Sequence, residues 1–194
     1  NGTGSLSVNG IMNWNSGFGN HGYVVSTTIT QTGTLNIGGS YAVLSSSLTN
    51  NGTTNLSSGA LGFGANGAFT NNATFNITST ATDFGFQAAS PGFTNSSTGT
   101  VSKSTSGDFL VGINFTNAGS LTIQMGTWQN NGGTNFVNSG SIGLSNNAVF
   151  RNSGSTIQFN SGTSISGTGT LQFSGGTTSF NTAVNLPSTV GLDF

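Results

Sequence analysis

A nine-residue pattern recurs along most of this chain, and it restricts the fold more than any other feature. The pattern opens with Phe, Leu or Ile and closes with an aliphatic residue. Between them it carries Asn or Gln in third place, a small residue in fifth place and Ser or Thr in sixth place. Clear copies begin at Ile29, Leu48, Phe69, Phe93, Phe115 and Phe136, the first with Gln31 in third place, and looser ones begin at Phe150 and Ile165.

The spacing of these copies predicts a coil of short strands. Successive first residues lie 19, 21, 24, 22, 21, 14 and 15 positions apart. A period of about 20 residues accommodates two or three strands and their bends in one turn of a solenoid. We therefore predict an all-β fold, a single-stranded parallel β-helix with turns of 19–24 residues. The two short final steps predict a tapering C-terminal end.

The extent of the pattern predicts one β-solenoid domain over residues 1–194. Its repeat core spans residues 29–173, preceded by an atypical first turn over 1–28 and followed by terminal strands over 174–194. Thr, Val, Ile and Phe are frequent and favour strands, while Glu, Lys and Arg are scarce, so we expect almost no helix.

Equivalent positions of stacked turns form columns along the axis of a solenoid. The third place of the pattern predicts a ladder of side-chain amides in the bends, although a row of amides that grips a sugar or a surface is an alternative reading. The predicted ladder consists of Asn50, Asn71, Asn95, Asn117, Asn138 and Asn152. The predicted aromatic core stack is Phe69, Phe93, Phe115, Phe136 and Phe150, beside an aliphatic column of Ile77, Val101, Ile123 and Leu144.

Composition excludes several classes of function. Charged residues make up 3% of the chain, and only two of them are cations. Nucleic-acid binding draws on several Lys and Arg side chains, so we expect no nucleic-acid partner. No stretch approaches the roughly 20 apolar residues of a spanning helix, so we expect no membrane insertion. The chain has no cysteine, and its residues suggest neither a metal site nor a cofactor.

Two aspartates are the strongest catalytic candidates. Asp83 and Asp108 lie 14 and 15 residues after the start of their repeats. That offset predicts carboxylates on adjacent turns about 5 Å apart, close to the separation in a retaining glycosidase. Lys103 is the only nearby cation, whereas polysaccharide lyases on this fold add basic residues and a metal cluster. A weak cation site and a surface pair without function are the alternatives.

Aromatic and threonine side chains suggest two further surface functions, sugar stacking and ice binding. Trp14 and Trp128 are the best candidates for a platform on which a sugar ring stacks, although the alternating pattern places most aromatic side chains inward. An ice-binding face requires a flat, regular threonine array. Threonines such as Thr34, Thr53 and Thr74 fall at bends, so we expect no sustained Thr-x-Thr column.

The ends of the predicted solenoid also bear on function. Repeat-like sequence runs from Gly4 to Leu171, and we find no amphipathic helix or charged strand that would cap the open strand edges. We therefore expect either a window of a longer solenoid, with flanking repeats as partners, or subunits that stack end to end.

The repeats resemble those of large bacterial secreted β-helix proteins, namely autotransporter passengers and haemagglutinin-like adhesins. The likeness rests on GTGTLQFSGGTTSF at residues 167–180 and on the FTN heads, and it covers roughly residues 29–180. The resemblance implies an extracellular or cell-surface protein used for adhesion, matrix building or as a stalk, usually without enzyme activity. Curli-type amyloid subunits are similar in period, but their paired Gln positions are missing here.

The leading hypothesis is a structural extracellular protein without enzyme activity. It would be a β-solenoid subunit or segment of a cell-surface fibre, matrix filament or adhesin shaft that associates end to end. The alternative is a carbohydrate-binding or carbohydrate-cleaving β-helix that uses Asp83, Asp108 and exposed aromatic residues, with a surface polysaccharide as its partner.

Overall fold

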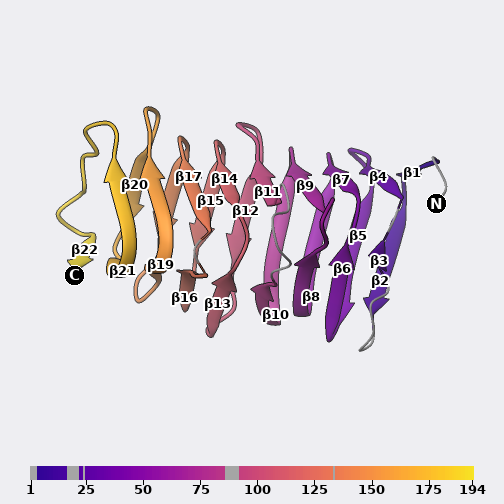
Figure 1. The fold of residues 1–194 in the computed structure, drawn as a ribbon, viewed down its shortest axis with the longest axis horizontal. Coiled ribbons are helices and arrows are strands. Elements are labelled where there is room, and N and C mark those ends of the chain that lie inside the picture. The colour runs from indigo at the N-terminus through magenta and orange to yellow at the C-terminus, as the bar shows by residue number, and fades with distance from the viewer. Residues whose placement is uncertain (1–3, 17–21, 24, 86–91, 133) are drawn as a thin grey trace.

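The chain folds as a parallel β-solenoid, as the repeat predicted. The computed structural model describes residues 4–16, 22–23, 25–85, 92–132 and 134–194. Strands stack along one long axis in about eight turns, with the two ends of the chain at opposite ends of the stack (Figure 1). The described part contains no helix, and hence none long and apolar enough to cross a membrane.

The strands form three rows, which we call the first, second and third faces, and neighbouring described strands within each row are parallel. The first face comprises β1 (Ser5–Val8), β4 (Ser26–Ile29), β7 (Ser47–Asn50), β9 (Ala68–Asn71), β11 (Gly92–Asn95), β14 (Phe115–Asn117), β17 (Asn135–Asn138) and the later halves of β19 (Val149–Phe159) and β21 (Thr170–Phe180). The second face comprises β2 (Ile11–Ser16), β5 (Thr34–Gly39), the earlier halves of β8 (Thr53–Phe63) and β10 (Thr74–Phe84), β12 (Thr100–Lys103), β15 (Ser120–Ile123), β18 (Ser141–Leu144) and β20 (Ser164–Gly167). The third face comprises β3 (Gly22–Tyr23), β6 (Tyr41–Leu44), the later halves of β8 and β10, β13 (Asp108–Val111), β16 (Thr127–Asn130), the earlier halves of β19 and β21, and β22 (Gly191–Asp193).

The turns do not taper toward the C-terminus, so that prediction was wrong. Phe136 pairs with Ile157 and Phe150 pairs with Leu171, both 21 residues further along. The spacings of 14 and 15 residues between the last copies of the pattern arose because Phe150 lies near the start of a third-face strand and Ile165 lies on the second face. The pattern thus recurs within a turn as well as between turns, because each face needs the same alternation of inward and outward side chains.

Stacking begins in the segment expected to be an atypical first turn. Strands β1 and β2 pair in register with β4 and β5, and β3 pairs with β6. Ile29, expected to open a repeat, pairs instead with Asn50 of the next turn. The bend after Ile29 is two residues longer than the bend after Asn50, because Thr34 and Thr53 are in register. The repeat therefore shifts by two residues at this turn.

An aromatic stack fills the interior of the first face. Phe69, Phe93, Phe115 and Phe136 lie in register, at most 1% exposed, with stacked ring centroids 4.9, 4.9 and 5.6 Å apart. Phe150 is buried too, but it does not belong to this stack, which corrects the prediction. It is in register with Trp128 on the third face.

The predicted aliphatic column is divided between two columns of the second face. Val101 pairs with Phe75 and Leu121, whereas Ile77 and Ile123 lie in the neighbouring inward column. Lys103 occupies the place between Ile77 and Ile123. The turn that contains the FTNSSTGTV copy has a longer bend, so counting from its first residue misplaced Val101 by two positions.

Glycine in the fifth place of the pattern has a steric cause at the first bend. A Cβ at Gly52 would overlap the carbonyl oxygens of Thr30 and Gly33 in the preceding turn. A Cβ at Gly119 would overlap the carbonyl oxygens of Ser96 and Gly99 in the same way. The bends of adjacent turns approach each other more closely than a side chain allows.

The aromatic stack generates a stability prediction. Phe115→Ala removes a ring that is 1% exposed and stacked on two others, and should lower the free energy of unfolding by about 3–5 kcal/mol. Urea unfolding measures the change, with Thr116→Ala as the control because Thr116 is exposed on the same strand. A loss below about 1 kcal/mol at Phe115 would contradict its place in the core.

Candidate functional site

A ladder of buried asparagine amides runs along the first face. The Nδ2 group of each residue donates to the Oδ1 atom of the next over distances of 2.7–2.8 Å. Each of these amides is 0% exposed, so none can contact a ligand. The ladder, which confirms the structural reading of the pattern, consists of Asn50, Asn71, Asn95, Asn117 and Asn138.

The ladder also satisfies backbone groups of the bend. Asn50 Nδ2 donates to the Thr74 carbonyl at 2.8 Å, and Asn95 Nδ2 donates to the Ser120 carbonyl at 3.1 Å. A buried carbonyl without a partner costs about 1–3 kcal/mol. Each asparagine therefore fixes its own bend and joins it to the bend of a neighbouring turn.

Asn152, predicted as the sixth member, lies outside this ladder. It is in register with Asn130 on the third face. Its Nδ2 group donates to the Ser155 carbonyl and to the Thr178 hydroxyl, both at 3.1 Å. Asn152 lies on the third face for the same reason as Phe150, because both residues belong to the first part of β19.

A second asparagine ladder runs along the outside of the second face. Asn36 donates to Asn13, Asn55 to Asn36 and Asn76 to Asn55, each over 2.9 Å. Our sequence reading missed this ladder, although three members occupy the eighth place of the nine-residue pattern. The third-place and eighth-place residues point to opposite sides of the solenoid wall, so one ladder is buried and the other contacts solvent.

Lys103 is fully buried and cannot serve as a catalytic cation. Its side chain is 0% exposed within an aliphatic column. The Nζ group donates to the carbonyls of Thr105, Gly107 and Met125 at 2.6, 2.8 and 2.7 Å. An ammonium group has three donors, and all three are used to join the bend of one turn to that of the next.

Burial lowers the pKa of Lys103 to about 8, while the negative charge of Asp108 opposes this shift. Removal of a cation from water disfavours its charged form, and a nearby anion favours it. The protonation of Lys103 is therefore coupled to the stability of the solenoid.

The two aspartates do not form the predicted pair. Asp83 is in register with Leu110, two residues beyond Asp108, so the carboxylates are diagonal neighbours on the sheet. Residues 83 and 110 are 27 positions apart, whereas the paired residues Asp108 and Thr127 of the next two strands are 19 apart. Counting from the start of each repeat therefore predicted the wrong register.

Each aspartate has its own surroundings. Asp83 Oδ2 accepts a hydrogen bond from the Thr82 hydroxyl at 3.3 Å, and burial raises the pKa of Asp83. Asp108 forms an ion pair with Arg151 over 4.0 Å, in which the Asp108 side chain is 57% exposed. Such an exposed pair contributes about 0–1 kcal/mol. A shared acid and base function is not supported by this arrangement.

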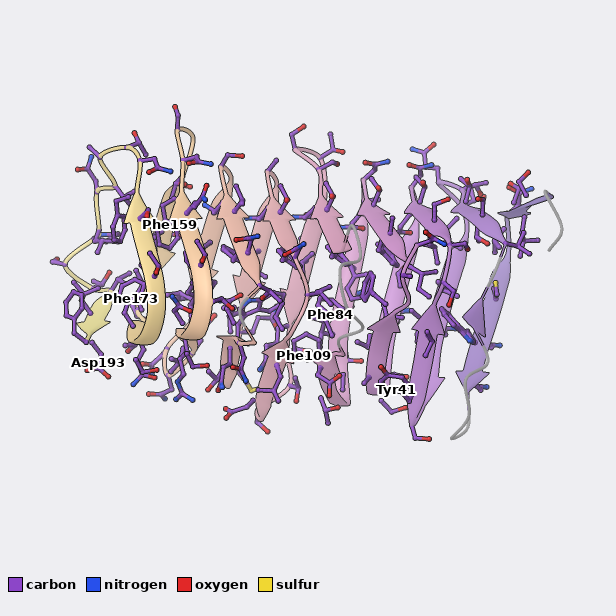
Figure 2. All side chains as sticks on the ribbon, in the orientation of Figure 1. Tyr41, Phe84, Phe109, Phe159, Phe173 and Asp193 are labelled. Carbon is purple, nitrogen blue, oxygen red and sulfur yellow. The ribbon has the colours of Figure 1, made fainter. Side chains whose placement is uncertain are left out.

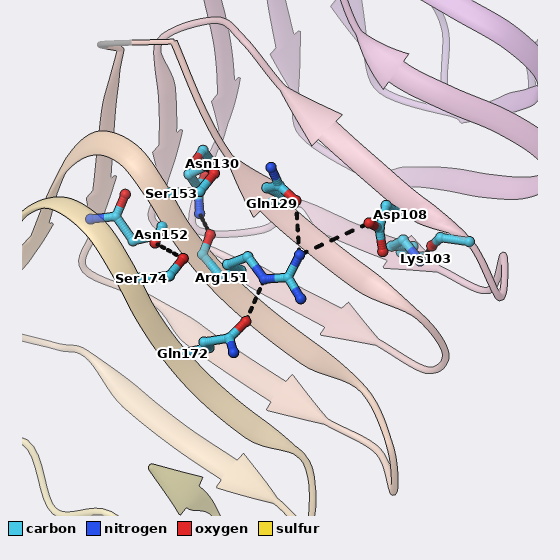
Figure 3. A network of polar contacts seen from close by, with 10 residues as sticks. Lys103, Asp108, Gln129, Asn130, Arg151, Asn152, Ser153, Gln172 and Ser174 are labelled. Atoms are coloured by element: carbon cyan, nitrogen blue, oxygen red, sulfur yellow. Dashed lines mark hydrogen bonds and ion pairs between the residues drawn. The ribbon is translucent and has the colours of Figure 1, made fainter. Parts of the chain in front are cut away.

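Arg151 links an axial row of polar side chains on the third face (Figure 3). Its guanidinium donates to Gln129 Oε1 at 3.1 Å and also to Gln172 Oε1. Gln172 in turn donates to Asp193 Oδ2 at 2.7 Å, and these residues lie in register on successive strands. On the outer surface, this row therefore connects successive turns through side-chain hydrogen bonds, as the buried asparagine ladder does in the interior.

Neither tryptophan forms a sugar platform, which corrects that prediction. Trp128 is 0% exposed and its ring contacts Phe84, Phe109 and Phe115. Figure 2 shows Phe84 and Phe109 in the interior of the stack. Trp14 is 9% exposed and belongs to the same core.

The structure aligns a column of single threonines, although the described strands form no sustained Thr-x-Thr array. Five threonines lie in register on the outward side of the first face, one per turn. Within the described part of the chain, their hydroxyl groups form no hydrogen bond to protein atoms. The column, which we call the threonine file, consists of Thr28, Thr49, Thr70, Thr94 and Thr116.

Comparisons with known proteins identify no relative. No family model matches the chain, and neither the curated proteins nor the solved structures contain a match. Within the described ranges, no group of three or more His, Cys, Asp or Glu side chains is placed to hold a metal ion. The fold is therefore shown by the structure itself, and function has to be argued from the surfaces and ends of the solenoid.

The buried ladder generates a prediction with a matched control. Asn95→Leu removes two hydrogen bonds between side-chain amides and leaves buried carbonyls unpaired, so it should lower the free energy of unfolding by about 2–4 kcal/mol. Asn55→Leu breaks two equivalent bonds in the outer ladder, where water can replace them, and should cost less than about 1 kcal/mol. Urea unfolding compares the two, and equal losses would contradict the role of burial.

Lys103 predicts a rise in stability with pH. Its pKa is about 8 when folded and 10.5 in its ordinary state, so between these values the unfolded chain binds more protons. The free energy of unfolding should then increase with pH, by about 3 kcal/mol for the full shift. Urea unfolding from about pH 7 to pH 9.5, below most tyrosine ionisation, tests this. Lys103→Met should remove the rise, and a flat profile in the native chain would contradict it.

Proposed function

We propose that this chain is a structural extracellular protein, a β-solenoid segment of a cell-surface fibre, matrix filament or adhesin shaft. The observation that carries the proposal is the use of polar side chains for bonds along the axis. The asparagine ladder, the outer ladder and the Arg151 row all connect one turn to the next. Side chains committed in this way stabilise a rod and leave few groups free for chemistry.

The shape and surface of the molecule support this proposal. About eight turns, with about 4.8 Å between neighbouring strands, span about 40 Å. Two cations and three acids in the whole chain generate little repulsion between neighbouring molecules. A rod of this kind joins further solenoid turns, which are either flanking repeats of a longer chain or a second copy.

A non-enzymatic role is part of the proposal. The groups considered for polysaccharide chemistry are separated or enclosed, because Asp108 contacts Arg151 and Lys103 is enclosed by carbonyl groups. Asp83 lies on a different turn from both. No described arrangement favours a carbohydrate-cleaving function over a structural one.

Immunolabelling tests the proposed location and role. Antibodies against the purified chain should label intact cells of the source organism, or fibres around them, without permeabilisation. Electron microscopy with gold-labelled antibodies would show whether the label follows elongated structures. Label that appears only after permeabilisation would overturn the proposal.

The threonine file favours a second candidate function, the binding of ordered water as in ice. Threonine side chains are restricted to few rotamers, and each presents one methyl and one hydroxyl group. Because the strands are stacked with a spacing of about 4.8 Å, the hydroxyl groups repeat at that interval. Val137 and Gln158 continue the column without a threonine, so the regular surface covers the N-terminal part of the solenoid.

A freezing assay tests this second candidate. Native protein should lower the freezing temperature of water below its melting temperature, and Thr70→Tyr should abolish the gap because it interrupts the middle of the file. Thr122→Tyr, on the outward side of the second face, is the control and should retain the gap. Absence of any gap with the native chain would contradict ice binding and leave the structural role unaffected.

A further inference from the structure

Exposed apolar side chains are concentrated on the terminal turns. At the N-terminal end Leu6 is 39% and Ile11 is 74% exposed. At the C-terminal end Phe180, Leu192 and Phe194 are 48%, 47% and 87% exposed. Among the described large apolar residues, only Leu110 and Met125 are comparably exposed elsewhere. The lateral faces are thus polar, while both ends present apolar surface.

Both ends also present an open strand edge on the first face. Among the described strands, β1 pairs with β4 alone, and residues 177–180 of β21 pair with β19 alone. Neither edge contains a charged residue or a proline. Natural sheets commonly protect an open edge with such residues, because an unprotected edge pairs with other strands.

The second face differs at the C-terminal end. Residues 181–190 form no strand, and Val184 and Leu186 pack against the core. Thr189 donates its hydroxyl hydrogen to the Gly167 carbonyl at 2.6 Å, which holds this segment on the last turn. The segment covers the second face, so the open strand edges at this end are residues 177–180 on the first face and β22 on the third face.

One inward column shows how the two edges match. The asparagine ladder is preceded by Val8 and Ile29 and followed by Phe159 and Phe180 in the same column. The rings of Phe159 and Phe180 are stacked with centroids 4.9 Å apart. The column is therefore polar in the middle and apolar at both ends.

We propose that a second copy of this chain stacks head to tail on the first, with β1 of one copy paired in parallel with residues 177–180 of the other. This inference rests on the proposed function, in which the solenoid is a structural rod. The same displacement that relates successive turns brings Leu6 over Thr178 and Val8 over Phe180. Phe159, Phe180, Val8 and Ile29 then form a continuous apolar column between two asparagine ladders. The joint continues the packing that already exists between turns of one chain.

The contact uses different surfaces on the two copies. Such a heterologous contact generates an open filament when the rotation between copies does not close a ring. Each joint leaves one free N-terminal edge and one free C-terminal edge on the assembly, so growth continues at both ends.

Two edge variants and their mixture test the proposal. The native chain, with a monomer mass of 19.4 kDa, should form filaments visible by electron microscopy and sediment as larger species at higher concentration. Leu6→Lys places a charge on the N-terminal edge, and Phe180→Lys places one on the C-terminal edge. Each variant alone should remain monomeric, because one of its two edges cannot be buried.

The mixture distinguishes a head-to-tail joint from other contacts. An intact C-terminal edge of Leu6→Lys can bind the intact N-terminal edge of Phe180→Lys, and growth then stops. Sedimentation velocity should therefore show about a twofold increase in mass and no filaments. Thr94→Lys, on the exposed side of β11, is the control for added charge and should assemble like the native chain. Circular dichroism confirms that each variant retains its strands.

Two results would contradict the proposed joint between copies. A native chain that stays monomeric at every concentration overturns the second copy as partner, while surface labelling in the source organism would still support the shaft through flanking repeats. Filaments formed by either edge variant alone would overturn the proposed joint and indicate lateral contacts.

Discussion

The parallel hydrogen-bonded stacking of one turn on the next is the interaction on which the rest of the structure depends. Because the pairings are in register apart from shifts within β8–β10 and β19–β21, most positions of the described strands meet an equivalent position about one turn later. A favourable side chain is therefore repeated as a column. The stacked rings from Phe69 to Phe136 and the amides from Asn50 to Asn138 are two such columns, one apolar and one polar.

One charged residue occupies a position that stacking otherwise fills with aliphatic side chains. Lys103 interrupts an aliphatic column, and three carbonyl groups from two bends surround its ammonium group. A buried lysine is costly unless its donors are satisfied. The chain meets this requirement locally, with carbonyl groups from the bends of two adjacent turns. Lys103 thus joins two bends through the hydrogen bonds of its ammonium group.

Function has to be sought where stacking leaves groups unused. The buried asparagine ladder and the Arg151 row bond to neighbouring turns. The hydroxyls of the threonine file and the strand edges of the terminal turns are not used in this way. A structural rod uses its ends, and an ice-binding surface uses its flat face. Both proposals follow from what remains after the ladders are formed.

The sequence alone determined the solenoid, its approximate period, the inward position of Phe69 to Phe136 and most of the buried amide ladder, because these follow from a local pattern repeated every turn. Only the tertiary structure decided which face each copy occupies. It moved Phe150 and Asn152 to the third face, separated Asp83 from Asp108 and aligned the threonine file. Bends of unequal length set the register between turns, and the pattern within a strand carries no information about how much chain a bend absorbs.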